Sequence, residues 1–265
     1  MWDLLIVTPL TNLLLWIYSL SGNNFGLAII LFTILIRLVT WPLTAQQLKG
    51  AQALQELQKD KEWQAIQKKY AKDREKLAQE QMRLYKERGI NPFGSCLPTL
   101  IQFPILIGLY QSLVRALATT PYGLLQLGRS LYPFLNAASL IPLNSRFLWM
   151  DLGRPESLPI QLGSFSFGLP TLAIIVAVTT YLQSKLTMPP SPSDPQDASA
   201  AQAAMMSQMM NIYMPLLLGY FALTFPSGLS VYFIVSNLLG IVQYAMLGKV
   251  NWRTLLPGKS QKKQE

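Results

Sequence analysis

Long runs of apolar residues alternate with short polar stretches along the chain, and the runs carry almost no charge. A helix needs about 20 such residues to cross the roughly 30 Å apolar core of a bilayer. The pattern predicts five transmembrane helices, over residues 23–48, 93–117, 168–186, 205–225 and 229–248. The predicted fold class is therefore an all-α integral membrane protein with five transmembrane helices.

Two other parts of the chain are apolar but differ from this pattern. Residues 118–167 contain several prolines, asparagines and arginines, so we expect an extracytosolic region at the membrane surface rather than backbone buried in lipid. Residues 1–22 have no lysine or arginine, and so lack the basic start of a signal peptide. Their polar side chains fall close to one helical face. This favours an amphipathic helix in the membrane interface, with a sixth transmembrane helix as the alternative.

Lysine and arginine are distributed unevenly between the predicted helices. The segment 46–92 carries 11 of them, the tail 249–265 carries five, and the loop after the third helix adds Lys185. The opposite side carries four, at Arg115, Arg129, Arg146 and Arg154. Because the more basic loops stay in the cytosol, the N-terminus is predicted outside and the C-terminus inside.

Residues 49–92 form the one strongly hydrophilic block. Apolar residues recur there at helical spacing in two runs, and Gly89 and Pro92 end the second run. This predicts an antiparallel helical hairpin in the cytosol. Its basic residues are candidates for docking a large partner, although a solvated hairpin without a partner explains the charge equally well. They are Lys59, Lys61, Lys68, Lys69, Lys72 and Arg74.

Composition excludes several kinds of site. The chain is 51% hydrophobic and only 13% charged, whereas soluble domains carry about 25% charge. It has no histidine and one cysteine, which excludes zinc clusters, disulfide frameworks and Ser-His-Asp triads. We expect no metal, no cofactor and no enzymatic activity. Residues 187–204 are rich in proline, serine and alanine and predict a disordered cytosolic loop, and the basic tail 249–265 can contact anionic lipid or RNA.

Arg37 is the residue that most needs an explanation. It lies nine residues before Gln46, which places it about 13 Å inside the bilayer. A lipid-facing arginine there costs at least about 2.5–3.5 kcal/mol, and arginine stays protonated in proteins. None of the five predicted helices contains an aspartate or a glutamate. We therefore expect a water-filled groove beside Arg37, with snorkelling to the interface as the alternative.

Polar residues around Arg37 support a groove. Thr33, Arg37, Thr40 and Thr44 are four, three and four residues apart, so they share one face of a helix. Each of the other polar residues within the predicted helices is, taken alone, more often a helix–helix hydrogen bond, but together they can complete a wet surface. They are Gln102, Gln111, Thr179, Gln183, Ser236, Asn237 and Gln243. Proton- and sodium-coupled transporters commonly use intramembrane acids or histidine, and these are absent. A fixed positive charge attracts an anion instead, either a small solute or an acidic residue of a moving polypeptide.

Four segments resemble the YidC membrane protein insertases, a family of bacteria, mitochondria and chloroplasts. They are ILIRLVTWPLT at 34–44, YKERGINPFGSCLPTLIQFPILIGLY at 85–110, FLWMDLG at 147–153 and FPSGLSVYFIVSNLLGIVQ at 225–243. The resemblance extends over about 24–247 in consistent order. It implies a five-helix core, a cytosolic hairpin, and a groove that is open to cytosol and lipid but closed outside.

The resemblance also implies roles for particular residues. The arginine at the position of Arg37 attracts acidic residues of the substrate, Gln183 matches a groove glutamine, and Phe233 stands where relatives carry a substrate-contacting Trp or Tyr. The implied partners are nascent membrane proteins, the ribosome, the Sec translocon, signal-recognition components and the lipid bilayer, with no specific nucleic-acid sequence. The implied location is a bacterial-type plasma membrane or a thylakoid membrane.

We therefore predict an insertase that is not an enzyme. It would move the hydrophilic tail of a nascent membrane protein through the groove and release the apolar segment into the bilayer, alone or with the Sec translocon. The alternative is a small-anion channel or carrier that uses the same groove.

Overall fold

The computed structural model describes residues 1–70, 73–90, 97–118, 120–136, 140, 143–162, 165–187 and 209–247. The described chain is mainly α-helical, as predicted. It divides into two compact units, one of Met1–Arg37, Ile107–Met188 and Met210–Glu265 and the other of Leu38–Leu106 and Pro189–Met209. The predicted loop at 187–204 and the tail at 249–265 lie almost entirely outside the described residues.

The first unit begins with a helix whose polar face points inward. A π-helical turn, η1 (Asp3–Val7), continues into α1 (Thr8–Leu20). Thr11, Asn12 and Tyr18 are buried, whereas Leu4 and Leu20 are largely exposed. The sequence interpretation placed these polar residues in an interface, facing water, and here they face protein instead. By length and hydropathy, Asp3–Leu20 is able to cross a membrane.

Contacts with α6 (Leu97–Ala116) and α7 (Pro121–Ser130) explain this orientation. Asp3 pairs with Arg115, and Ser112 donates to the carbonyl of Val7 at 3.2 Å. The Asn12 amide donates to the carbonyl of Ser130 at 2.9 Å and accepts from the backbone of Tyr132 at 2.7 Å. The polar residues of the first helix therefore serve tertiary contacts, which a one-dimensional pattern does not distinguish from contact with water.

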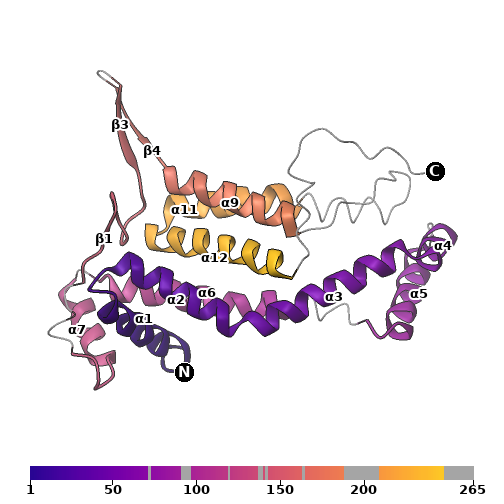
Figure 1. The fold of residues 1–265 in the computed structure, drawn as a ribbon, viewed down its shortest axis with the longest axis horizontal. Coiled ribbons are helices and arrows are strands. Elements are labelled where there is room, and N and C mark those ends of the chain that lie inside the picture. Colours follow the sequence, from indigo (N-terminus) through magenta and orange to yellow (C-terminus); the bar gives the residue numbers. More distant parts are fainter. Residues whose placement is uncertain are drawn as a thin grey trace. The chain divides into compact units, whose positions relative to one another are not determined.

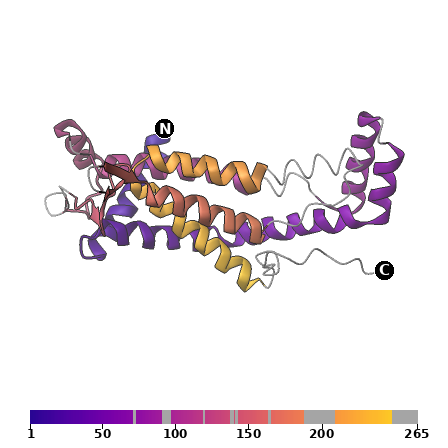
Figure 2. The same ribbon diagram turned by 90° about the horizontal axis from the view of Figure 1, so that it is seen from above.

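Four apolar helices make up most of the rest of this unit: α2 (Phe25–Val39), α9 (Thr171–Thr187), α11 (Met214–Thr224) and α12 (Ser227–Met246). A π-helical turn, η2 (Met209–Tyr213), comes directly before α11. Helix α9 packs against both α11 and α12 (Figure 1 and Figure 2). Besides Asp3–Leu20, Ser227–Met246 meets the length and hydropathy of a membrane span, and Phe25–Val39, Phe103–Ala116 and Asn211–Thr224 are shorter apolar helices. The arrangement with five transmembrane helices stays a prediction.

Two short antiparallel β-hairpins accompany the mainly helical architecture. Strands β1 (Arg146–Phe147) and β2 (Met150–Asp151) pair with each other, and so do β3 (Leu158–Leu162) and β4 (Phe165–Leu169). The β3–β4 hairpin immediately precedes α9 (Figure 1). Its sequences, LPIQL and FSFGL, contain the alternation typical of strands. Strands this short are easily missed beside long apolar helices.

The second unit contains the hydrophilic block as three helices. They are α3 (Trp41–Lys59), α4 (Lys61–Lys69) and α5 (Arg74–Glu87). Asp60 is extended between the first two, and its carboxylate accepts from the backbone of Glu62 at 3.1 Å and from Arg88 at 2.8 Å. The chain therefore turns at Asp60 as well as after α4, because an aspartate favours an N-cap over a helix interior.

A small hydrophobic cluster holds α4 and α5 together. Leu57, Trp63, Ile66 and Leu84 are buried there, and the rings of Trp63 and Tyr85 lie 5.2 Å apart. The indole nitrogen of Trp63 is buried without a hydrogen-bond partner among the described residues. The same burial raises the pKa of Tyr85. Trp63 therefore stabilises the hairpin by apolar contact and contributes one uncompensated polar group.

We expect Trp63→Ala to destabilise this hairpin by about 3–5 kcal/mol, since it empties the centre of the cluster. Trp63→Phe should cost far less, because it keeps most of the ring and removes a buried N–H whose desolvation costs about 1–3 kcal/mol. Hydrogen–deuterium exchange of the whole protein in detergent measures both effects on α4 and α5, with α9 and α12 as the internal reference. Equal protection losses for the two variants would contradict this account.

Candidate functional site: a polar cluster at Arg37

Arg37 lies in the last turn of α2 and is held by α12. Its Nε donates to the hydroxyl of Ser236 at 3.0 Å, and its Nη2 donates to the Ser236 hydroxyl at 2.6 Å and to the Ser236 carbonyl at 2.8 Å. Ser236 is only 5% exposed. One buried serine thus fixes the guanidinium through three hydrogen bonds, and a serine supplies no full negative charge.

Helix α9 joins the same cluster through hydrogen bonds to Asn237 of α12. The Asn237 amide donates to the hydroxyls of Thr179 at 3.1 Å and Thr180 at 2.8 Å. These are side-chain bonds between apolar helices, where polar residues commonly link neighbours. They fix the rotation of α9 so that its next polar residue along the helix, Gln183, faces α12.

Gly240 makes room for Gln183. A Cβ atom at Gly240 would lie 2.5 Å from Nε2 of Gln183 and 3.8 Å from Nη2 of Arg37. The amide of Gln183 and the guanidinium of Arg37 therefore share the space that the missing side chain leaves. Three helices meet here through polar groups: α2 through Arg37, α9 through Gln183, and α12 through Ser236 and Gly240.

Burial changes along α2 at this cluster. Between Phe25 and Thr33 most side chains are buried, whereas from Ile34 to Val39 every side chain is half-buried or exposed. In α12 the first six residues, Ser227 to Tyr232, are all buried, and exposed positions begin only at Leu238. Arg37 therefore lies in the part of α2 whose side chains are less buried than those at the Phe25 end.

The predicted groove residues have different surroundings in the structure. Thr179, Gln183 and Asn237 belong to the cluster, as just described. Thr33 is fully buried and donates to the carbonyl of Ile29 at 2.6 Å. Phe233 packs on the buried residues Ala173, Val176 and Ala222.

The other predicted residues lie in the second unit. The α2 helix ends at Val39, and α3 begins at Trp41 with a proline in its first turn, so the single continuous helical face that the spacing implied is interrupted at Thr40. The hydroxyl of Thr44 donates to the carbonyl of Thr40 at 3.0 Å. The side chain of Gln102 lies outside the described residues.

Thr180 and Gly240 are the cluster residues that the groove candidates did not include, whereas Ser236 was among those candidates. Ser236 and Gly240 are four residues apart, so they lie on one face of α12. Their small size was the available signal, because a close approach by a long side chain from another helix needs small residues opposite it. The partner itself, Arg37, is 199 residues away in the chain from Ser236, and no local pattern identifies it.

The basic residues of the hairpin are only partly described. Lys61, Lys68 and Lys69 are exposed, and Nζ of Lys69 lies 5.2 Å from the ring centre of Tyr70. Lys72 and the side chains of Lys59 and Arg74 lie outside the described residues. The three described lysines can contact a partner of opposite charge without rearrangement.

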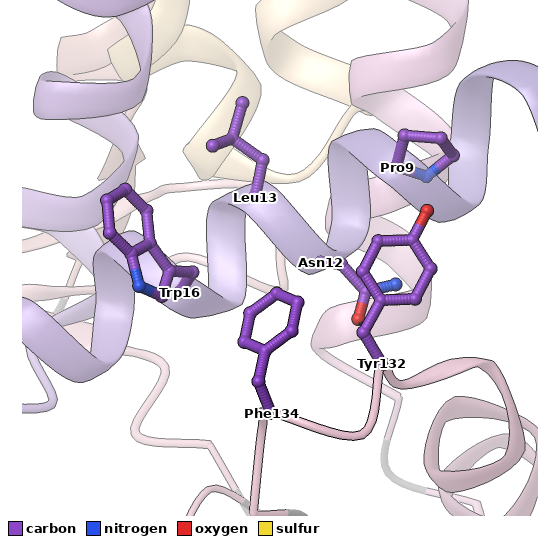
Figure 3. Close-up of a pocket in the computed structure, with 6 residues that line it drawn as sticks. All are labelled: Pro9, Asn12, Leu13, Trp16, Tyr132 and Phe134. Carbon is purple, nitrogen blue, oxygen red and sulfur yellow. Dashed lines mark hydrogen bonds between the residues drawn. The ribbon is translucent and has the colours of Figure 1, made fainter.

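A pocket on α1 has no groups for chemistry. It measures about 310 Å³ and is lined by Pro9, Asn12, Leu13, Trp16, Tyr132 and Phe134 (Figure 3). Asn12 is the one polar amide in this lining, and it already bonds to backbone groups of Thr8, Ser130 and Tyr132. Among the described residues no group of three or more Cys, Asp or Glu side chains is able to hold a metal ion.

Comparison with known proteins identifies the family. Residues 16–253 match the family described as 60Kd inner membrane protein. Membrane protein insertase MisCA of Bacillus subtilis (strain 168) is 36% identical over 246 residues, which cover 91% of this chain and 77% of MisCA. The chain belongs to the YidC family of membrane protein insertases. As a member of the YidC family it is an integral membrane protein.

Two further YidC relatives differ in length. YidC 2 of Listeria innocua is 34% identical over 269 residues, which cover 100% of this chain and 75% of that protein. YidC of Syntrophobacter fumaroxidans is 36% identical over 244 residues, which cover 91% of this chain but 37% of the relative. The YidC likeness thus includes α2, α9 and α12, which carry the Arg37 cluster.

We expect Gly240→Ala to disturb the cluster, because the new methyl group overlaps the Gln183 amide. Overpacking of this kind costs about 1–3 kcal/mol, and thermal unfolding in detergent measures it. Gly219→Ala is the matched control, since a Cβ there meets Ala177 at 3.2 Å and touches no residue of the cluster. Adding Gln183→Ser to Gly240→Ala should restore stability, and failure to do so would place the clash elsewhere.

Proposed function

We propose that this YidC-family protein inserts membrane proteins by accepting the hydrophilic tail of a nascent chain at the Arg37 cluster. The tail enters from the open end of α2, and the following apolar segment passes into the bilayer, alone or with the Sec translocon. The observation that carries the proposal is a guanidinium held by a serine among apolar helices whose sequences contain no carboxylate.

The charge balance of the cluster supports an acidic ligand. The hydroxyl and carbonyl of Ser236 orient the guanidinium but leave its full positive charge in place. Two unit charges 4 Å apart interact by about 4 kcal/mol at an effective dielectric constant of about 20. An acidic side chain of a client would therefore gain more from Arg37 than the same contact gives in bulk water, and it would leave again once its own charge reached solvent.

The bilayer supplies the remaining driving force. A hydrophilic tail that passes along a polar face avoids part of the apolar barrier, and burial of the client's apolar segment then favours the inserted state. A negative charge that moves outward is also favoured by the membrane potential, at about 2.3 kcal/mol per charge per 100 mV. The protein needs no reaction cycle or cofactor for this work.

The hairpin of α4 and α5 is the part that we assign to delivery. Its exposed lysines, Lys61, Lys68 and Lys69, can contact ribosomal RNA or acidic surfaces of signal-recognition components. Such contacts follow the phosphate backbone or surface charge, so no particular nucleotide sequence is required.

We expect Arg37→Ala to reduce insertion of clients with acidic tails by about tenfold, which corresponds to about 1.4 kcal/mol. Arg37→Lys should keep most of the activity, because it preserves the charge. Insertion into proteoliposomes that contain the purified protein, scored by protease protection of the tail, measures both. A client whose tail lacks acidic residues serves as the control and should respond to neither variant.

Two outcomes would change this proposal. Equal losses for both variants would show that the geometry of the guanidinium, rather than its charge, is required. If instead the proteoliposomes pass small anions without any client and insert nothing, a channel or carrier would replace the insertase.

We expect deletion of residues 55–83 to impair insertion of ribosome-bound chains while the apolar helices stay folded, because the hairpin belongs to a separate compact unit. Cotranslational insertion should fall, whereas insertion of a purified, released client should not. Loss of the whole protein from the membrane would contradict this separation.

Substitutions that change the charge of the hairpin test its role in delivery without deleting a segment. Replacing Lys61, Lys68 and Lys69 together by glutamate should weaken ribosome binding and make the remaining binding less dependent on salt. Replacing the same three lysines by arginine preserves the charge and should leave both the affinity and its salt dependence unchanged. A glutamate triple variant with undiminished binding would exclude these lysines from docking.

A further inference from the structure

Residues 147–156, which we call the clasp, touch the N-terminal ends of three helices that are far apart in the sequence. Their contacts with α12 use backbone carbonyls. The first-turn N–H groups of Ser227 and Gly228 donate to the carbonyls of Arg154 at 2.8 Å and Leu152 at 3.1 Å. The hydroxyl of Ser227 donates to the carbonyl of Asp151 at 2.7 Å. The clasp thus satisfies donors that have no partner within the helix.

Glu156 connects the clasp to α9. It is only 9% exposed, and its carboxylate accepts from the backbone of Leu172 at 3.0 Å and from the hydroxyl of Thr171 at 2.7 Å. The indole of Trp149, within the clasp, donates to the same carboxylate at 3.1 Å. A negative charge at a helix N-terminus is favourable. All three donors point at one buried group.

The contact with α2 is made by packing. A Cβ atom at Gly26 would lie 2.1 Å from the ring of Phe147, so the ring occupies the place of the missing side chain. Leu152 is fully buried, and its carbonyl would lie 3.3 Å from a Cβ at Gly228. The clasp therefore fills the space between the first turns of α2 and α12.

We propose that Glu156 is a positioning residue: through the clasp it keeps the N-terminal ends of α2, α9 and α12 joined and free of water. The Arg37 cluster is then reached from the opposite end alone. This inference rests on the proposed function, since a one-sided approach has a purpose only if a client enters at Arg37. It explains why the first turns of α2 and α12 are buried while the last turns are open.

The chemistry of the site requires a carboxylate in particular. Glu156 presents two acceptor oxygens to three donors. An amide has a single acceptor oxygen, and its NH₂ group would face at least one of these donors. Glu156→Gln should therefore loosen the clasp with almost no change in volume, and Glu156→Ala should release it from α9.

Cysteine labelling tests the proposal in the whole protein in proteoliposomes, in a Cys96→Ser background. Leu229→Cys reports on the clasp end, where Leu229 is 4% exposed, and Ala245→Cys reports on the exposed far end of α12. A membrane-impermeant maleimide is added to one face at a time. Glu156→Ala should raise labelling of Leu229→Cys from the clasp side at least tenfold, with Glu156→Gln intermediate and Ala245→Cys unchanged.

Asp151→Asn is the matched control, because among the described residues the Asp151 carboxylate accepts only from Gly153 within the clasp, at 3.0 Å. It should leave both reporters unchanged. Thr171→Ala, which removes one donor to Glu156, is a second and milder test and should raise labelling of Leu229→Cys less than Glu156→Ala does.

Two results would overturn the proposal. Unchanged protection of Leu229→Cys in Glu156→Ala would show that Glu156 does not hold this end, and a parallel rise at both reporters would show general unfolding rather than a positioned end. If Arg37→Ala still reduces insertion of clients with acidic tails in those cases, the insertase proposal stands and the clasp alone is wrong. If the clasp opens as expected while Arg37→Ala has no effect, the proposed function is wrong.

Discussion

The rest of the structure depends on one permanent positive charge among apolar helices. Arg37 has no carboxylate near it in the sequence of α2, α9 or α12, and a buried serine orients it instead. Replacing Ser236 by an acid would neutralise the charge in place, and replacing it by an apolar residue would leave the guanidinium without that support. Serine orders the guanidinium through hydrogen bonds and adds no negative charge of its own, as the proposed acceptance of an acidic client requires.

The two ends of the bundle formed by α2, α9 and α12 are held by different kinds of interaction. At the clasp end, backbone carbonyls and Glu156 satisfy the first turns of α12 and α9, and Phe147 packs into the space at Gly26. At the Arg37 end, side-chain amides and hydroxyls connect the helices and leave the surface half-open. A closed, well-bonded end and an open, polar end are what a protein needs if a client enters and leaves from one side.

Part of this arrangement was predictable from the sequence. Apolar runs predicted helices at the positions of α2, α9 and α12. Arg37, in a run without an acidic residue, predicted a water-filled groove; the structure brings the candidates Gln183 and Asn237 together with Arg37 and Ser236, and the groove itself stays a prediction. Periodicity does not reveal what a polar face contacts, so the inward-facing Thr11 and Asn12 were assigned to an interface. It also extended the polar face of α2 through Thr40, where the helix ends. The contacts of the clasp with the first turn of α12 are accepted by main-chain carbonyls, which every residue possesses, so no side-chain pattern predicts them.

The chemistry of the Arg37 cluster has a consequence for acidity. Its described members are an arginine, serine, threonines, glutamine and asparagine, and the chain has no histidine. None of these groups gains or loses a proton across the range in which cells live. The charge of these side chains therefore stays the same in acidic and alkaline surroundings. If a client is transferred along this site as proposed, any sensitivity of the transfer to protons belongs to the acidic residues of that client.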